Sequence, residues 1–376
     1  MIKIVSLSQT KNKRKFIKEF IEFPKRLYID EEKWVPWFNI DMRHILKKKH
    51  PFFLHSDGEF FLAEENSKTA GRICVVSNVR YQKEHDRKCA HFFFLDAGET
   101  KEIFKLLIEA AAEWAGNQGV EYFDGPMLFG GAYGSGLLIE GYDLPSPMTM
   151  MPYNYPYYRT MIEELGFFKL FDTYGTDISP NNFSPPEKIE LFAKRVLEHG
   201  RFKVLEFKTK KEVLKKAEEL LNLYNTTLAD HPEDYPLTDK ELAQLKKDLA
   251  PVAAPDLIKI LTYDEKVVGY LLAFADISPV LHRNMGKITI FGLIRMMRNL
   301  KRSNKVLFNG MGILPEYQRL GGNALLYHEL SKTVRSRDFK IAKTVQINES
   351  TKLMLSDIRK LGAISETTHR VYTLKL

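Results

Sequence analysis

The part of this chain with the clearest chemical potential is a glycine-bearing turn between an apolar strand and a helix. Residues 308–330 read FNGMGILPEYQRLGGNALLYHEL, and the turn carries Arg319, Gly321 and Gly322 just before a helix start at Asn323. A helix start presents several backbone N–H groups around one point, with the positive end of the helix dipole behind them. Glycine keeps side chains out of the way of an approaching anion. The pattern therefore predicts a pyrophosphate-binding loop.

The turn is neither the longer GxxxxGK[ST] nucleotide loop nor a GxGxxG fingerprint. On local sequence alone, an ordinary strand-to-helix turn that contains glycine is an equally good interpretation.

Residues 311–326 resemble motif A of the GNAT superfamily, whose members are acyl-CoA-dependent N-acyltransferases. The family pattern is Arg or Gln, two residues, Gly, one residue, then Gly or Ala, and Arg319, Gly322 and Ala324 match it. The preceding GMGILPEY is similar to the family's fourth strand, whose backbone pairs with the pantetheine of CoA. Asn348 is similar to the Asn of a later motif that contacts CoA.

This resemblance implies that acetyl-CoA or another acyl-CoA is the co-substrate and that no metal takes part. The residues implied to bind it are Met311, Gly312, Ile313, Arg319, Leu320, Gly321, Gly322, Asn323, Ala324 and Asn348. The implied reaction is direct acyl transfer from a thioester to an amine. It requires removal of a proton from the ammonium, stabilisation of an oxyanion and protonation of the leaving thiolate. The family stabilises the oxyanion with a backbone N–H of the fourth strand, here near Met311–Ile313.

The groups that would move protons are less well defined. The family often uses a Tyr about seven residues after the Asn of the later motif, and this chain has Leu355 there. Tyr327 and Tyr372 are the substitutes, although a buried Tyr is often a packing residue. The candidates for the general base are loop residues that could equally cap turns: Asp230, His231, Asp276 and His282.

Four landmarks recur along the chain at a nearly constant offset. Lys3 corresponds to Lys203, Gly71 to Gly269, Asn154 to Asn348 and Gly166 to Gly362, at offsets of 200, 198, 194 and 196 residues. A repeat of this length predicts a duplicated domain, the alternative being two unrelated α/β halves. The stretch SPNNFSPPEK at 179–188 is the expected linker.

We therefore expect two tandem GNAT-like domains, residues 1–180 and 190–376. Each should be of the α/β (α+β) class, with a mixed, mostly antiparallel twisted sheet flanked by helices.

The first copy departs from the family pattern at the phosphate loop. The corresponding sequence, FLDAGETKEIFKLL, has the single Gly98 beside Asp96 and Glu99. Carboxylates near a helix start stabilise the helix but repel a pyrophosphate. We expect this copy to shape an acceptor pocket or to be structural, with a divergent second CoA site as the alternative. The aromatic segments 34–38 and 148–158 could line such a pocket or pack between the domains.

Charge and composition narrow the class of ligand. The 376 residues carry a net charge of +8, which suits phosphates, CoA or nucleic acid, or simply a soluble surface. Arg295, Arg298 and Arg302 share one helix face, either solvated or in contact with the CoA 3′-phosphate or an anionic substrate. Aromatic residues are not interleaved with these arginines, so the pattern does not favour nucleic-acid binding.

Several features indicate a cytoplasmic protein without a membrane span. The chain has two cysteines and no CxxC spacing, its N-terminus does not resemble a signal peptide, and it has no apolar run of about 20 residues. Similar tandem chains are bacterial.

These observations lead to one expected function and two alternatives. The expected function is an acyl-CoA-dependent N-acyltransferase, with acetyl-CoA as the first donor to consider and a small-molecule or peptide amine as acceptor. One alternative is an aminoacyl-tRNA-dependent transferase of the tandem-GNAT type. The other is a non-catalytic acyl-CoA-binding protein, suggested by the missing Tyr. The sequence does not specify the amine, the acyl length or the oligomeric state.

Overall fold

The computed structural model describes residues 1–130, 133–181, 187–227 and 231–376. The chain divides into two compact units that are each discontinuous in sequence. Unit 1 consists of Met1–Thr173, Ser278–Leu293 and Thr367–Leu376, and unit 2 consists of Tyr174–Ile277 and Ile294–Glu366.

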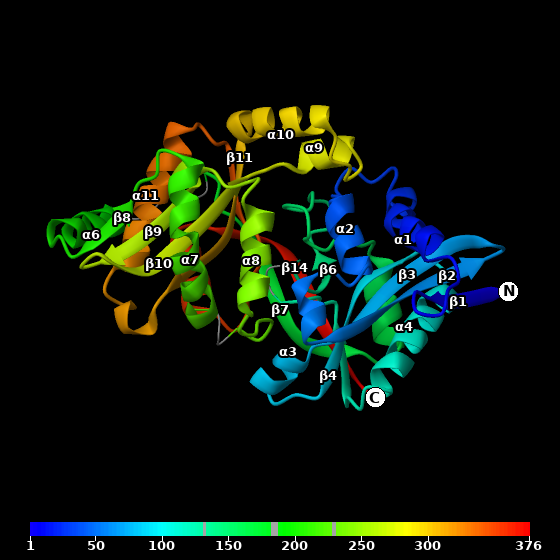
Figure 1. Cartoon of the computed structure of the whole chain (residues 1–376). Coiled ribbons are helices and arrows are strands. Elements are labelled where there is room, and N and C mark those ends of the chain that lie inside the picture. Colours follow the sequence, from blue (N-terminus) through cyan, green and yellow to red (C-terminus); the bar gives the residue numbers. More distant parts are fainter. Residues whose placement is uncertain (131–132, 182–186, 228–230) are drawn as a thin grey trace. The chain divides into compact units, whose positions relative to one another are not determined.

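Unit 1 is built on a mixed sheet with the strand order β1-β2-β3-β4-β5-β14 (Figure 1). Neighbouring strands are antiparallel except β4 and β5, which are parallel. The strands are β1 (Ile2–Ser6), β2 (Asp57–Glu65), β3 (Lys68–Ser77), β4 (Cys89–Ala97), β5 (Tyr122–Gly125) and β14 (Ile364–Lys375), with β6 (Leu137–Glu140) paired to β14. The helices are α1 (Lys13–Leu27), α2 (Asn39–Leu46), η1 (Pro51–Leu54), α3 (Val79–Glu84), α4 (Lys101–Gly116), α5 (Tyr157–Glu164) and α9 (Ser278–Arg283).

Unit 2 repeats this plan with the strand order β7-β12-β11-β10-β9-β8. Again one neighbouring pair is parallel, β11 with β12, and the others are antiparallel. The strands are β7 (Phe168–Asp177), β8 (Phe202–Leu205), β9 (Ile258–Tyr263), β10 (Lys266–Ala275), β11 (Lys305–Ile313) and β12 (Ile341–Thr344), with β13 (Ile347–Asn348) paired to β7. The helices are α6 (Glu187–Glu198), α7 (Lys210–Thr227), α8 (Asp239–Leu249), η3 (Pro255–Leu257), η4 (Pro315–Tyr317), α11 (Gly322–Ser336) and α12 (Lys352–Lys360). Helix α10 (Ile290–Arg302) begins in the segment of unit 1 that ends at Leu293 and continues into unit 2.

The expected fold class is confirmed, since each unit is a mostly antiparallel sheet flanked by helices. The sheet of unit 2 has an apolar core on both faces, because successive side chains along a strand point to opposite faces. On β10, Leu271 and Ala273 pack with α11, whereas Tyr270, Leu272 and Phe274 pack with α7.

The last strand of each sequence repeat pairs with a strand of the other repeat. Strand β14 pairs with β5, where Tyr372 lies opposite Gly125, and the end of β7 pairs with β12, where Asp177 lies opposite Lys343. The compact units therefore interleave in sequence, while the division into repeats at 1–180 and 190–376 stays a prediction.

The sequence did not lead us to expect α6 or β6. Helix α6 begins at Glu187, inside the stretch 179–188 that we assigned to the linker, so the predicted end of the linker was wrong. Residues 182–186 of that stretch lie outside the described residues. Strand β6 has only four residues and is held by its pairing with β14. Short strands of this kind depend on a distant partner rather than on local sequence.

Truncation of a core residue tests this packing. Leu325 lies on α11 with its side chain fully buried in the core of unit 2. We expect Leu325→Ala to lower the free energy of unfolding by about 2–5 kcal/mol, because it removes apolar contacts and leaves a cavity. Leu353→Ala, at a residue that is 72% exposed, should change it by less than about 0.5 kcal/mol. Urea denaturation followed by circular dichroism measures both, and equal effects would contradict the assigned core.

Candidate active site

The predicted phosphate loop has the backbone geometry of an anion site. Arg319 and Gly321 adopt left-handed conformations, with φ of 62° and 95°, and Gly321 is the N-cap residue of α11. The amides of the first helical turn have no acceptor within the helix, and no described side chain caps them. The side chains of Arg319 and Leu320 are exposed beside this turn.

The two glycines of the loop also have a packing role that the sequence did not reveal. A Cβ at Gly322 would lie 2.6 Å from Leu261 Cδ2, and one at Gly321 would lie 2.7 Å from Val196 Cγ2 and 2.8 Å from Phe192 Cε1. Both residues therefore allow α11 to approach the sheet and α6 closely. A phosphate would have to approach from the side of the N–H groups.

A break in strand pairing opens the sheet next to this loop. Strand β11 pairs with β12 only from Lys305 to Phe308. Its register with β10 shifts at the same place, because Ala273 lies opposite Phe308 and Leu272 lies opposite Gly310. Asn309 is thus an extra residue, a β-bulge. Beyond it β11 keeps its pairing with β10, while its edge toward β12 is unpaired among the described strands.

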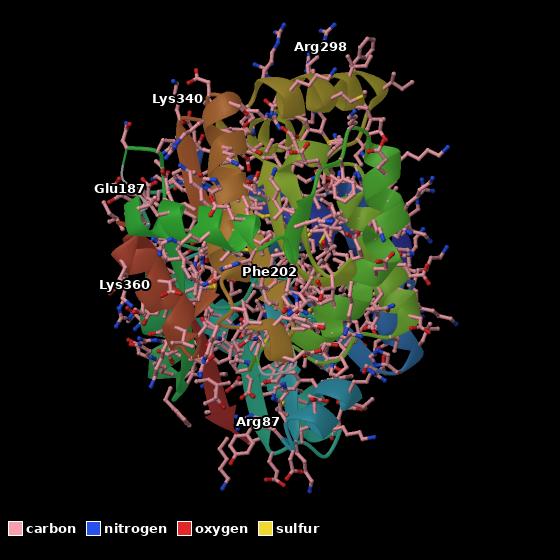
Figure 2. The ribbon with its side chains drawn as sticks, turned by 90° about the vertical axis from the view of Figure 1, so that its left-hand side faces the viewer. Arg87, Glu187, Phe202, Arg298, Lys340 and Lys360 are labelled. Atoms are coloured by element: carbon pink, nitrogen blue, oxygen red, sulfur yellow. The ribbon has the colours of Figure 1, made fainter. Side chains whose placement is uncertain are left out.

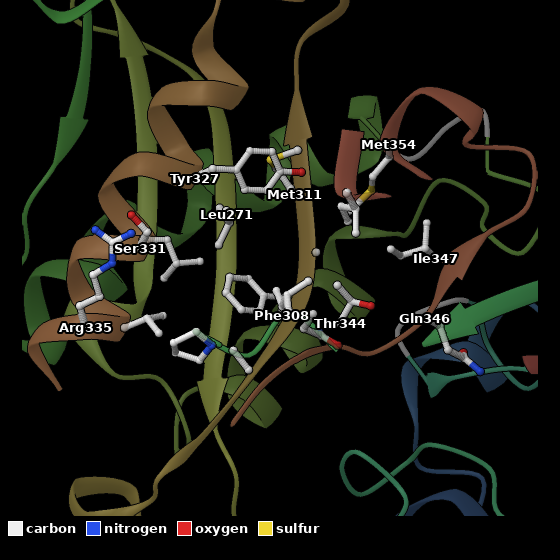
Figure 3. A pocket seen from close by; sticks show the side chains of 18 residues that line it. Leu271, Phe308, Met311, Tyr327, Ser331, Arg335, Thr344, Gln346, Ile347 and Met354 are labelled. Carbon is white, nitrogen blue, oxygen red and sulfur yellow. The ribbon is translucent and has the colours of Figure 1, made fainter. Parts of the chain in front are cut away.

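A pocket occupies this opening (Figure 3). The edge of β11 supplies Asn309, Gly310 and Met311, and a Cβ at Gly310 would meet no atom within 4 Å. Apolar side chains from β10, β11, α11, β12 and α12 form most of the wall, with Tyr327, Ser331, Thr344 and Arg335 as polar members. The pocket therefore combines accessible backbone with apolar surface, as in sites that bind an extended chain.

The residues predicted to bind CoA all lie in unit 2, in two settings. Those from Met311 to Ala324 follow β11 into the start of α11, with Met311 on the pocket wall. Asn348 is buried at the end of β13, where its Nδ2 donates to Glu233 Oε2 at 2.6 Å and its Oδ1 accepts from Ser350 N at 2.9 Å. Both ends of the Asn348 side chain are thus already bonded.

Glu233 is a buried acid that the sequence analysis did not single out. Its burial and the neighbouring Asp234 carboxylate raise the pKa of Glu233, and the hydrogen bond from Asn348 opposes that shift. The acid pair lies between Pro232 and Pro236, in the same arm as His231. Two adjacent acids between two prolines are the feature of the sequence from which Glu233 could have been identified as a candidate site residue.

Among the predicted proton-transfer residues, Tyr327 lies on the pocket wall. Burial raises the pKa of its phenol. Asp276 is buried directly after the end of β10, and its Oδ2 lies 3.5 Å from Nζ of Lys305, the first residue of β11. His231 is half-buried, and its carbonyl accepts from Asp234 N at 3.1 Å. Asp230 lies outside the described residues.

Tyr372 belongs to unit 1 rather than to the unit that contains the pocket. Its ring is fully buried in the core, and its hydroxyl donates to Glu163 Oε1 at 2.9 Å. These contacts are those of a packing residue whose hydroxyl is satisfied.

In unit 1, Asp96 and Ala97, at the position that corresponds to the phosphate loop, are bonded to side chains from other parts of the unit. The Asp96 carboxylate accepts from Arg72 Nε at 2.7 Å and from the Tyr28 hydroxyl at 3.0 Å. The Tyr158 hydroxyl accepts from Ala97 N at 2.8 Å, and the Tyr157 hydroxyl donates to Ala97 O at 2.8 Å. Side chains thus use the backbone positions that a pantetheine arm would need here.

One cluster among the described residues consists of residue types that often bind metal ions. Potential ligand atoms of Cys89, His91 and Asp124 lie within 4.8 Å of one another. However, the Arg87 guanidinium donates to both carboxylate oxygens of Asp124, at 2.8 and 3.0 Å. Burial also raises the pKa of the Cys89 thiol, which keeps it protonated. A cation next to Arg87 and a neutral thiol is unfavourable, so the cluster does not indicate a metal centre.

The buried Glu233 predicts a pH dependence of stability. Its pKa in the folded state is above its unfolded value, so its contribution is fully present below about pH 4.3 and is lost as the pH rises through the folded value. Glu233→Gln stays neutral and retains an oxygen for Asn348. We expect its free energy of unfolding to fall less between pH 5 and pH 9 than that of the wild type, by about 1–3 kcal/mol. The exposed Glu164→Gln is the control, and parallel curves for the wild type and Glu233→Gln would refute the assignment.

No family model matches the sequence, but two bacterial proteins match over nearly its whole length. Protein YghO of Escherichia coli is 27% identical over 99% of this chain and 96% of its own length. A bacterial ceramide synthase of Caulobacter vibrioides is 25% identical over 95% of this chain and 94% of its own length.

Among the helices that the structure describes, none combines the length and the hydrophobicity that a membrane span requires.

Solved structures show what the fold is. A tandem GNAT protein of the clavulanic acid biosynthesis pathway matches all of this chain and 98% of its own with a TM-score of 0.58 at 11% identity. The glucosamine N-acetyltransferase region of a fungal β-N-acetylglucosaminidase also matches all of this chain, and 38% of its own, with a TM-score of 0.58 at 11% identity. The chain therefore has the fold of the GNAT acetyltransferases, in the two-copy form found in tandem-GNAT proteins.

Proposed function

We propose that the chain is an N-acyltransferase that binds an acyl-CoA along the open edge of β11 and transfers the acyl group to an amine. The observation that carries this proposal is the apolar pocket beside the unpaired backbone of Asn309, Gly310 and Met311. A thioester needs hydrogen-bond donors for its carbonyl oxygen and an enclosed space for its acyl chain, and this opening offers both.

The phosphates of CoA would bind the uncapped first turn of α11. The exposed Arg319 would complement their charge without having to leave a buried position. The pantetheine would then extend from this turn along the edge of β11 in the way a further strand would.

The reaction would proceed through a tetrahedral intermediate. A base takes a proton from the ammonium, the amine nitrogen attacks the thioester carbon, and N–H donors of β11 stabilise the oxyanion. The nitrogen, which is now positively charged, releases a second proton to solvent, so that the amide product is neutral. Collapse breaks the carbon–sulfur bond. We propose Tyr327 as the proton donor to the thiolate, because it lies on the pocket wall and burial, which raises the pKa of its phenol, keeps the phenol protonated. Glu233 is the best candidate base, since its raised pKa makes it more basic than an ordinary carboxylate.

The acceptor that we propose is a long-chain amino alcohol, with a long-chain acyl group as the donor. A ceramide is the amide of such an amine with a fatty acid, and the relative from Caulobacter vibrioides is named a ceramide synthase. The mainly apolar pocket wall supports a long acyl chain over acetyl. The competing assignment is acetyl-CoA as the donor with a small water-soluble amine as the acceptor.

A charge reversal in the loop tests the phosphate site. Arg319→Glu places a carboxylate at an exposed position next to the uncapped amides, so we expect the Kd for CoA to rise by about tenfold or more. This variant is preferable to a substitution of Gly322, where any side chain would clash with Leu261. Calorimetry with CoA measures the effect. The exposed Lys340→Glu is the control, and equal binding by all three proteins would remove the site assignment.

A side chain added in the pocket tests the acyl class. In Gly310→Leu, the new Cβ meets no other atom, and we expect the side chain to extend into the pocket that Gly310 lines. We therefore expect kcat/KM for palmitoyl-CoA to fall about tenfold or more, while kcat/KM for acetyl-CoA changes less than about threefold. Thiol release with sphinganine as acceptor is the measurement, and Gly116→Leu, also at an open position, is the control. Equal losses with both donors would contradict the pocket assignment. Binding of acyl-CoA without thiol release from any amine would contradict catalysis.

A further inference from the structure

Helix α10 displays large apolar side chains at the protein surface. Ile290 is 77% exposed, Phe291 76% and Met297 63%, and Leu293 and Ile294 are exposed as well. Single exposed apolar residues are common, but five within eight consecutive residues form a continuous patch. Neither the sheet core nor the proposed acyl site uses this patch.

The opposite side of α10 is firmly held, so the exposure does not reflect a frayed helix. Gly292 and Met296 are buried. Asn299 Nδ2 donates to the carbonyl of Asp276 at 2.6 Å, and Arg337 Nη2 donates to the carbonyl of Leu300 at 2.7 Å. The helix is thus fixed along one side and presents its other two sides outward.

Those two outward sides differ in chemistry. Ile290, Ile294 and Met297 recur at spacings of four and three residues and form an apolar strip. Arg295, Arg298 and Arg302 recur at spacings of three and four and form an exposed basic strip next to it, with the exposed Phe291 one turn before Arg295 at the start of that strip. Figure 2 shows the side chain of Arg298 projecting away from the helix.

Along the sequence, the charge in and on either side of α10 has one sign over a long stretch. From residue 277 to residue 315 the chain contains no Asp or Glu and seven basic residues: Arg283, Lys287, Arg295, Arg298, Lys301, Arg302 and Lys305. An amphipathic helix with an apolar strip beside a basic strip is suited to lie in the interface of a bilayer, with its apolar side chains among the acyl chains and its bases near lipid phosphates.

We propose that α10 docks the protein on an anionic phospholipid surface. A nucleic acid would use the arginines but leave the apolar strip in water. A second copy of the chain would bring two basic strips together, which like-charge repulsion opposes. An anionic bilayer satisfies both strips at once. This inference is independent of the proposed function, because lipid binding requires neither acyl-CoA nor turnover.

Vesicle flotation of the full chain tests the proposal without any catalytic readout. We expect binding to vesicles of phosphatidylcholine with 30% phosphatidylglycerol to exceed binding to pure phosphatidylcholine by roughly tenfold or more, and to weaken at 0.5 M NaCl. The triple variant Arg295→Gln, Arg298→Gln and Arg302→Gln should lose roughly tenfold or more of the binding to anionic vesicles. Its charge-matched control is the triple variant at exposed lysines elsewhere: Lys105→Gln, Lys332→Gln and Lys360→Gln.

A site-specific probe then reports whether the apolar strip enters the lipid. Both native cysteines are buried, so Met297→Cys can be labelled selectively with an environment-sensitive fluorophore. Its emission should shift to the blue on anionic vesicles, whereas a label at Leu353→Cys, an exposed apolar residue on α12, should not respond.

The proposal fails if the wild type binds neutral and anionic vesicles equally, if it binds neither, or if the arginine variant binds like its lysine control. It also fails if sedimentation shows self-association that Phe291→Ser abolishes while vesicle binding is absent, since the patch would then be a protein interface. Circular dichroism of each variant confirms that a lost signal does not come from unfolding.

Discussion

The site depends on one structural constraint, the end of pairing between β11 and β12 at Phe308. A parallel ladder that continued would satisfy the edge of β11 and leave no room between the strands. The bulge at Asn309 shifts the register with β10 and turns the following backbone toward the opening. The pocket, the accessible groups of Gly310 and Met311, and the approach from the first turn of α11 all follow from this break.

A buried polar pair at the end of β13, the strand whose Ile347 lines the pocket, is held by a contact between distant parts of the chain. Asn348 ends a two-residue strand, and Glu233 reaches it across 115 residues of sequence. A buried acid bonded in this way is costly unless its partner is held, and β13 and the turn through Ser350 hold Asn348 in place. The same bond that stabilises the arm thus keeps an acid with a raised pKa close to a residue of the predicted CoA motif.

The two copies of the fold have diverged in how they use the same backbone positions. In unit 1, tyrosines and the Arg72–Asp96 pair satisfy the groups at the end of β4. In unit 2, the corresponding end of β11 faces a pocket. Strand β14 of the second repeat pairs with β5 of the first, and the end of β7 in the first repeat pairs with β12 of the second, so neither sequence repeat completes its sheet alone.

Local periodicity and turn residues were enough to predict most of the order of strands and helices, the two-copy fold and the position of the loop, although not α6 or β6. The tertiary structure was needed to establish that Asn309 is a bulge, since that depends on the register of β11 with β10. It also decided that Gly321 and Gly322 face α6 and the sheet, and that Glu233 meets Asn348. Periodicity placed Arg295, Arg298 and Arg302 on one helix face, but it could not tell which sides of α10 the protein covers. Burial is a property of the surrounding elements and not of the helix alone.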